Sequence, residues 1–213
     1  MSFSNYTALQ AEILDYLARD DLTSKIPSFI TLAEAKFNRA LMCRDMEQRS
    51  TATVDLSSVE PEFVSLPTDF QSMRRIRLNS VTGKPRLEFA TQAFIDDKRY
   101  GAANAVGQPR WFSVMGNELE LFPMPDAAYG IEMTYRKNIP ALASNSSNWL
   151  LSAHPDAYLY GALMESEPYM KNDARIATWA QALSAVIDQI NSVSLQSAFN
   201  AGPLSMQMRG ATP

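Results

Sequence analysis

The sequence predicts an α+β fold in which a block of β-strands interrupts a helical domain. Three observations lead to this prediction. Near both ends of the chain, apolar residues recur every three or four positions, as on one face of a helix. From about residue 49 the period changes to the alternation of apolar and polar residues that is typical of strands. The strands follow one another instead of alternating with helices, which favours α+β over a doubly wound sheet.

We expect four segments along the 213 residues. Residues 1–48 and 148–199 are expected to form two helix pairs that pack into one four-helix unit, because each pair has only one apolar face to bury. Residues 49–147 are the expected antiparallel β-rich domain, inserted between the pairs. Residues 200–213 have no periodicity and contain glycine, proline and methionine, so we expect an extended C-terminal arm.

Capping signals define the first helix pair. Ser4 or Asn5 can cap the first helix, because a short polar side chain can accept a hydrogen bond from an unpaired amide of the first turn. Pro27 is tolerated in the first turn of a second helix, which we expect to reach Met46 or beyond. The exposed side of this second helix is expected to carry Glu34, Lys36, Arg39 and Arg44.

The most basic cluster of the chain lies in the β-rich segment. Arg74-Arg75-Ile76-Arg77-Leu78 alternates charged and aliphatic side chains, so Ile76 and Leu78 should face a core while Arg75 and Arg77 face outward. A short run of charges is usually a solvated or ion-paired sheet face. Contacts of Arg74, Arg75 and Arg77 with DNA or with another subunit are the alternative.

A hairpin and the second helix pair complete the expected elements. Met115-Gly116-Asn117 is a turn signal between two apolar runs, with Glu118 and Glu120 on the face away from the apolar residues. Ser152 is the expected cap of a helix that begins near Ala153. Pro168 is expected to end that helix, because proline lacks the amide hydrogen that continues it.

Composition limits the classes of function. A formal charge of -4 and a pI near 5.1 disfavour a general nucleic-acid binder. Cys43 is the single cysteine, so neither an intramolecular disulfide nor a multi-cysteine metal site is expected. No run of about 18 apolar residues predicts a membrane span. The segment MSFSNYTALQ lacks the features of a secretion signal, so we expect synthesis in a reducing cytoplasm.

Motifs for catalysis are lacking. His154 is the only histidine, it stands at an expected helix start, and neither Cys43 nor any serine lies in a nucleophile signature. One histidine makes a zinc site improbable, and no glycine pattern predicts a phosphate or dinucleotide site. We therefore expect no cofactor, no metal and no enzymatic activity.

Four stretches together resemble the head-to-tail adaptor proteins of tailed bacteriophages and prophages. The similarity covers about Ser4 to Ile190, in the order that the family has. The stretches that carry it are SNYTALQAEILDYLARDDLTSKIPSFITLAEAKFNRALMCRDME, FVSLPTDFQSMRRIRLN, GQPRWFSVMGNELELFPMP and NWLLSAHPDAYLYGALMESEPYMKNDARIATW.

The resemblance implies a structural virion protein of the head–tail neck. It implies a ring, typically of about twelve subunits, docked under the portal, with a tail or nozzle protein on the opposite side. DNA would pass through the channel during genome ejection without sequence-specific binding. The expected portal-binding residues of the arm are Gly202, Pro203, Leu204, Met206, Met208 and Arg209.

Two other functions stay open from the sequence. One is a cell-wall hydrolase associated with a phage tail, using dispersed carboxylates such as Glu118 or Glu120. The other is a DNA-binding module that uses Arg74, Arg75 and Arg77, for which binding would have to depend on salt.

Overall fold

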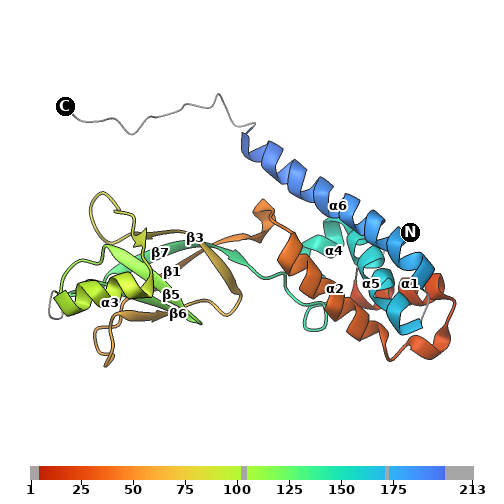
Figure 1. Ribbon diagram of the computed structural model, residues 1–213, viewed down its shortest axis with the longest axis horizontal. Helices are drawn as coiled ribbons and strands as arrows, with labels where there is room; N and C mark the ends of the chain where they lie inside the picture. Colours follow the sequence, from red (N-terminus) through yellow and green to blue (C-terminus); the bar gives the residue numbers. More distant parts are fainter. Residues whose placement is uncertain (1–4, 102–104, 171–172, 200–213) are drawn as a thin grey trace. The chain divides into compact units, whose positions relative to one another are not determined.

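The computed structural model describes residues 5–101, 105–170 and 173–199 (Figure 1). Its contacts divide the chain into a helical unit, Met1–Asp45 with Ile139–Pro213, and a β-rich unit, Met46–Asn138. The α+β class that the sequence predicts is confirmed. The grouping into two helix pairs and the domain limits at residues 49 and 147 stay predictions. The arm residues Gly202 to Arg209 lie outside the described residues.

The first two long helices of the helical unit are α1, Tyr6–Leu17, and α2, Ile26–Ala40. Asn5 caps α1, since its side-chain oxygen accepts a hydrogen bond from the amide of Ala8 at 2.8 Å. The expected continuation of α2 to Met46 is wrong, because Asn191 binds the backbone where the helix ends. Its side chain donates to the carbonyl of Ala40 and accepts from the amide of Met42, at 3.1 and 2.7 Å.

The remaining helices of this unit are α4, Trp149–Ala153, α5, Pro155–Met170, and α6, Asp173–Phe199. Two expectations are corrected here. The cap of α4 is Asn148, whose side chain accepts from the amide of Leu151 at 2.9 Å, and Ser152 lies within the helix. Pro168 lies inside α5. The helix ends two residues later, so proline removes one hydrogen bond of the last turn without interrupting it earlier.

Helix α5 forms the centre of the helical unit, in contact with α1, α2, α4 and α6. Its residues are buried on nearly all sides, as expected of a central helix. Tyr158 of α5 is fully buried, and its hydroxyl donates to Glu34 of α2 at 3.3 Å. Glu34 also accepts from the amide of Leu142, at 2.8 Å. Glu34 was expected on the exposed side of α2; it is buried because residues 139–148 and α5 cover it.

The β-rich unit contains two sheets whose facing sides share one apolar core. The first sheet is antiparallel in the order β1–β7–β3, with strands Glu47–Thr53, Gly130–Lys137 and Phe70–Leu78. The second has the order β2–β6–β5–β4, with strands Phe63–Ser65, Glu118–Phe122, Trp111–Met115 and Glu88–Phe89. The strand pairs of both sheets are antiparallel except β4 with β5, which is parallel.

Helix α3, Gln92–Gly101, covers the outer side of the second sheet (Figure 1). Ile95 of α3 is fully buried in a small cluster with Ala90 and Phe122. Among the described helices, none combines the length and the apolar composition that a membrane span requires.

Candidate functional site

The outer side of the first sheet is the most distinctive surface of the β-rich unit. Along β7, Ile131, Met133 and Tyr135 point into the core, so Glu132 points to the outer side. The register places Arg77 of β3 opposite Glu132. Ile76 and Leu78 are buried while Arg75 and Arg77 share the outer side, as the sequence predicts.

Three arginines surround the carboxylate of Glu132. Its side chain is only 5% exposed, and Nη2 of Arg77 lies 2.6 Å from Oε1. Nη1 of Arg49 lies 3.2 Å from Oε2, and Nη2 of Arg75 lies 3.9 Å from Oε1. A buried carboxylate is tolerated when it is paired in this way. One carboxylate cannot neutralise three guanidinium groups, so the surface keeps an excess of positive charge.

Further arginines extend the positive surface. Arg74 lies at an irregularity in the register of β3 and binds Glu47, with Nη2 at 3.0 Å from Oε1. Arg86 pairs with Arg77 in an isolated antiparallel bridge, which places both side chains on one side. We call this surface the arginine face; its charged residues are Arg49, Arg74, Arg75, Arg77, Arg86, Arg136, Glu47 and Glu132.

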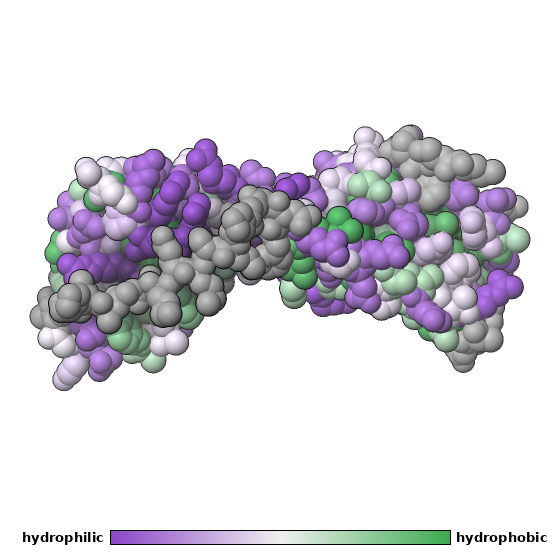
Figure 2. Space-filling model, turned by 90° about the horizontal axis from the view of Figure 1, so that it is seen from above, coloured by the Kyte–Doolittle hydropathy of each residue, from purple (hydrophilic) through white to green (hydrophobic). Residues whose placement is uncertain are grey.

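The arginine face is positively charged although the chain as a whole is negatively charged. It holds six arginines and two glutamates, whereas the chain carries a net charge of -4. Figure 2 shows hydrophilic residues gathered over the β-rich unit, on the side where Figure 1 places β1, β3 and β7. Such a surface binds carboxylates or phosphates, because the guanidinium group matches the geometry of both.

The opposite side of the β-rich unit is acidic. Its charged residues lie on α3 and on the outward positions of β4 and β6. Glu120 is buried beneath α3 and pairs with Arg99 at 2.8 Å, so this carboxylate is not open to a substrate. We call this surface the acidic side; its charged residues are Glu88, Asp96, Asp97, Glu118, Glu120, Lys98 and Arg99.

The structure brings together residues that sequence reasoning left apart. Arg49 and Arg136 join the predicted arginine cluster because β7 lies between β1 and β3. The alternation along β7 already predicts that Glu132 and Arg136 share one side. No local sequence pattern indicates that β7 pairs with β1 and β3, so the full set of residues on the arginine face could not be predicted.

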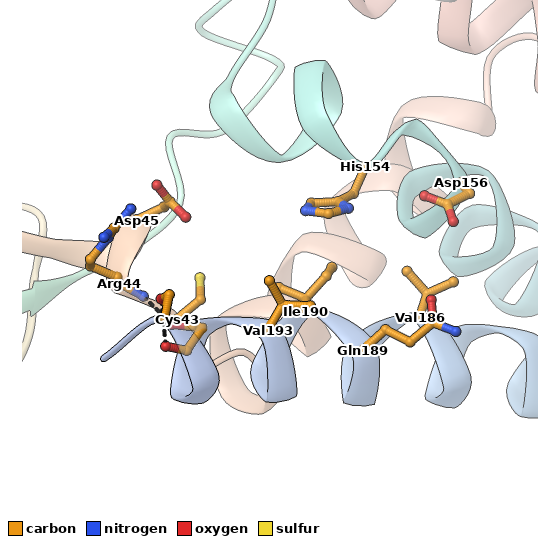
Figure 3. A pocket seen from close by; sticks show the side chains of 11 residues that line it. Cys43, Arg44, Asp45, His154, Asp156, Val186, Gln189, Ile190 and Val193 are labelled. Atoms are coloured by element: carbon orange, nitrogen blue, oxygen red, sulfur yellow. Dashed lines mark hydrogen bonds between the residues drawn. The ribbon is translucent and has the colours of Figure 1, made fainter. Parts of the chain in front are cut away.

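A groove in the helical unit contains the only histidine (Figure 3). It lies between residues 43–45, the junction of α4 and α5, and the second half of α6, and its volume is about 300 Å³. The amide of Arg44 donates to the hydroxyl of Ser194 at 2.9 Å along its edge. Within the described residues, the imidazole of His154 makes no hydrogen bond or ion pair, and Cys43 is buried.

In the described part of the chain, His154 is therefore not hydrogen-bonded to a nucleophile for which it could act as a base. Nor do three or more histidine, cysteine, aspartate or glutamate side chains come together as a metal site anywhere in the described parts of the chain. The arginine face is therefore the better candidate for a functional surface, and its chemistry is that of binding.

Comparison with protein families agrees with the resemblance found in the sequence. A family model described as "SU10 adaptor protein" matches residues 4–207. The match covers nearly the whole chain, including both compact units. A search of curated proteins found no match.

Proposed function

Because the chain belongs to the SU10 adaptor protein family, a phage family with a structural role, we propose that it is a head-to-tail adaptor of the virion. Copies of the chain form a ring, typically of about twelve subunits, that docks under the portal. A tail or nozzle protein binds the other side of the ring. DNA passes through the channel during ejection without sequence-specific binding. The chain is made in the cytoplasm of the host bacterium and functions in the neck of the virion.

One observation carries the proposal: the family match spans residues 4–207. The match spans both compact units and continues to residue 207. The buried helix α5, held by four neighbouring helices, supports the role of a rigid frame. The arginine face supports a role in binding an acidic surface.

Removal of residues 202–213 tests the attachment to the portal. We expect the full chain to bind its portal protein, and the shortened chain to bind at least about tenfold more weakly. The physical reason is that removing these residues removes the contacts that we propose they make with the portal. Binding is measured by co-sedimentation with portal rings, and circular dichroism checks that the shortened chain keeps its fold.

Two results would count against the proposal. If the full chain does not bind the portal at all, the adaptor function is contradicted. If both chains bind equally well, the adaptor function stands and the role of Gly202 to Arg209 is rejected.

A further inference from the structure

We propose that the arginine face of one copy binds the acidic side of the β-rich unit of the next copy. This inference rests on the proposed ring and assigns the contact that joins neighbouring subunits. The occupant of the arginine face is therefore a second copy of this chain.

The charges of the β-rich unit are divided between two opposite sides. Residues 46–138 contain twelve acidic and eleven basic residues, so the unit as a whole is nearly neutral. Six of its arginines nevertheless lie on the arginine face. Five carboxylates lie on the acidic side with Lys98 and Arg99, and Arg110 lies beside Glu88 at its edge. The shared apolar core lies between the two sheets, so the two surfaces lie on opposite sides of it. They meet at one edge, where Arg86 and Glu88 line the same groove.

Opposite charges on opposite sides suit a head-to-tail contact. Each copy can bind one neighbour with its arginine face and another with its acidic side. A contact between two different surfaces closes into a ring when the rotation from copy to copy allows it. Complementary charge also directs the approach of the subunits and prevents pairing of like surfaces.

The arginines are both ordered and accessible. Arg49 and Arg74 keep 68% and 62% of their side chains exposed although each makes an ion pair. The bond to a fixed carboxylate orders the guanidinium before a partner arrives, which lowers the entropy lost on binding. The acidic side also exposes Phe94, Tyr100 and Met115. Aromatic residues and methionine are enriched at protein interfaces.

Nucleic acid is the competing occupant of the arginine face. Phosphate binding would use the same guanidinium groups and would weaken with salt. The near neutrality of the β-rich unit and the acidic balance of the chain favour a carboxylate-bearing protein partner. The acidic side of the same unit supplies such a partner.

Two charge-reversed double variants of the full chain test the contact. Arg74→Glu with Arg86→Glu reverses the edge of the arginine face and leaves the three arginines around Glu132 in place. Asp96→Arg with Glu118→Arg reverses the acidic side and leaves the Arg99–Glu120 pair in place. Each variant alone brings like charges together, so we expect half-assembly of rings to need at least about tenfold more protein.

Mixing the two variants in equal amounts is the decisive step. Every contact between the two kinds of subunit again joins opposite charges, so the mixture should form rings as the wild-type chain does. Subunits that had lost their fold would not recover on mixing. Assembly is followed by sedimentation velocity at low salt and by electron microscopy. Lys25→Glu with Arg39→Glu changes the net charge by the same amount as the arginine-face variant, at exposed sites of the helical unit, and should leave assembly unchanged.

The outcomes separate this contact from the proposed function. Rings that persist in both charge-reversed variants overturn the inference but leave the ring and the adaptor function intact. Absence of rescue on mixing also overturns it. DNA binding by fluorescence anisotropy that falls in Arg74→Glu with Arg86→Glu, while rings persist, assigns the arginine face to nucleic acid instead. A wild-type chain that never forms rings contradicts the proposed function itself.

Discussion

At the scale of single residues, buried acidic side chains connect distant parts of the chain. Glu34 joins α2 to Leu142 and to Tyr158 of α5, and Asn148 donates a hydrogen bond to the hydroxyl of Tyr158 at 2.7 Å. Burial raises the pKa of Glu34 above its ordinary value of 4.5, although the hydrogen bonds oppose that shift. Ionisation of Glu34 therefore destabilises the folded state relative to its protonated form.

Replacing Glu34 separates its charge from its hydrogen bonds. With a raised pKa in the fold, Glu34 contributes stability that is present below the unfolded pKa and lost as pH rises through the folded pKa. Glu34→Gln keeps an acceptor oxygen without the charge. We expect it to be at least as stable as the wild type at pH 7, without the loss above about pH 4.5.

Glu34→Ala is the matched control. It leaves the amide of Leu142 without its acceptor, so the free energy of unfolding should fall by about 2–4 kcal/mol. Urea unfolding at pH 4 and pH 7 measures both variants. A Glu34→Gln variant that is destabilised as much as Glu34→Ala would show that the charge itself stabilises the fold.

The face of the sheet on which a side chain lies was predictable from the sequence where the alternation of polar and apolar residues alone decides it. Ile76, Leu78, Arg75 and Arg77 follow the period of a strand, and the structure places them accordingly. The burial of Glu34 and Glu120 was not predictable, because each is covered by an element distant in the sequence or on another layer. Elements that are distant in the sequence bury these two glutamates, and the residues next to them in the chain do not indicate that burial.

At the scale of elements, the contact between α2 and α5 depends on a small residue. A side chain at Gly161 of α5 would place its Cβ 2.8 Å from Cζ of Phe37 and 3.0 Å from Cβ of Ala33. The first distance is shorter than ordinary packing allows. Glycine at this position therefore lets the two helices approach closely.

Gly161→Ala tests this approach. Alanine favours a helix by about 1 kcal/mol over glycine, but overpacking against Phe37 and Ala33 should cost about 1–3 kcal/mol. We expect a net loss of stability in thermal unfolding. Gly101→Ala in α3 is the control, since nothing lies within 4 Å of the new Cβ there, and it should be neutral or stabilising. A gain in both variants would contradict close packing at Gly161.

The ends of elements were predictable only where the signal is local. The cap of α1 follows from Asn5, which accepts a hydrogen bond from the first turn, and Thr91 accepts one from the amide of Phe94 at the start of α3. The end of α2 was not predictable, because Asn191 fixes it from about 150 residues away in the sequence. The prediction that Pro168 ends its helix was wrong, because a proline this close to the end of a helix removes only one hydrogen bond of the last turn.

At the scale of the whole molecule, the order of helices and strands was enough to predict the α+β class and its inserted sheet block. The arginine face could be predicted in part, from β3 alone. Its full extent depends on which strands are neighbours, which follows from long-range pairing. Family membership adds the structural role in a phage, which no pattern of charge or periodicity in the chain indicates by itself.

Electron microscopy of the purified chain together with its portal tests the central claim most directly. The account predicts closed rings of this chain, docked coaxially on one side of the portal, with an open channel through both. Single copies that bind the portal without forming a ring, or rings that do not dock on it, would contradict the account.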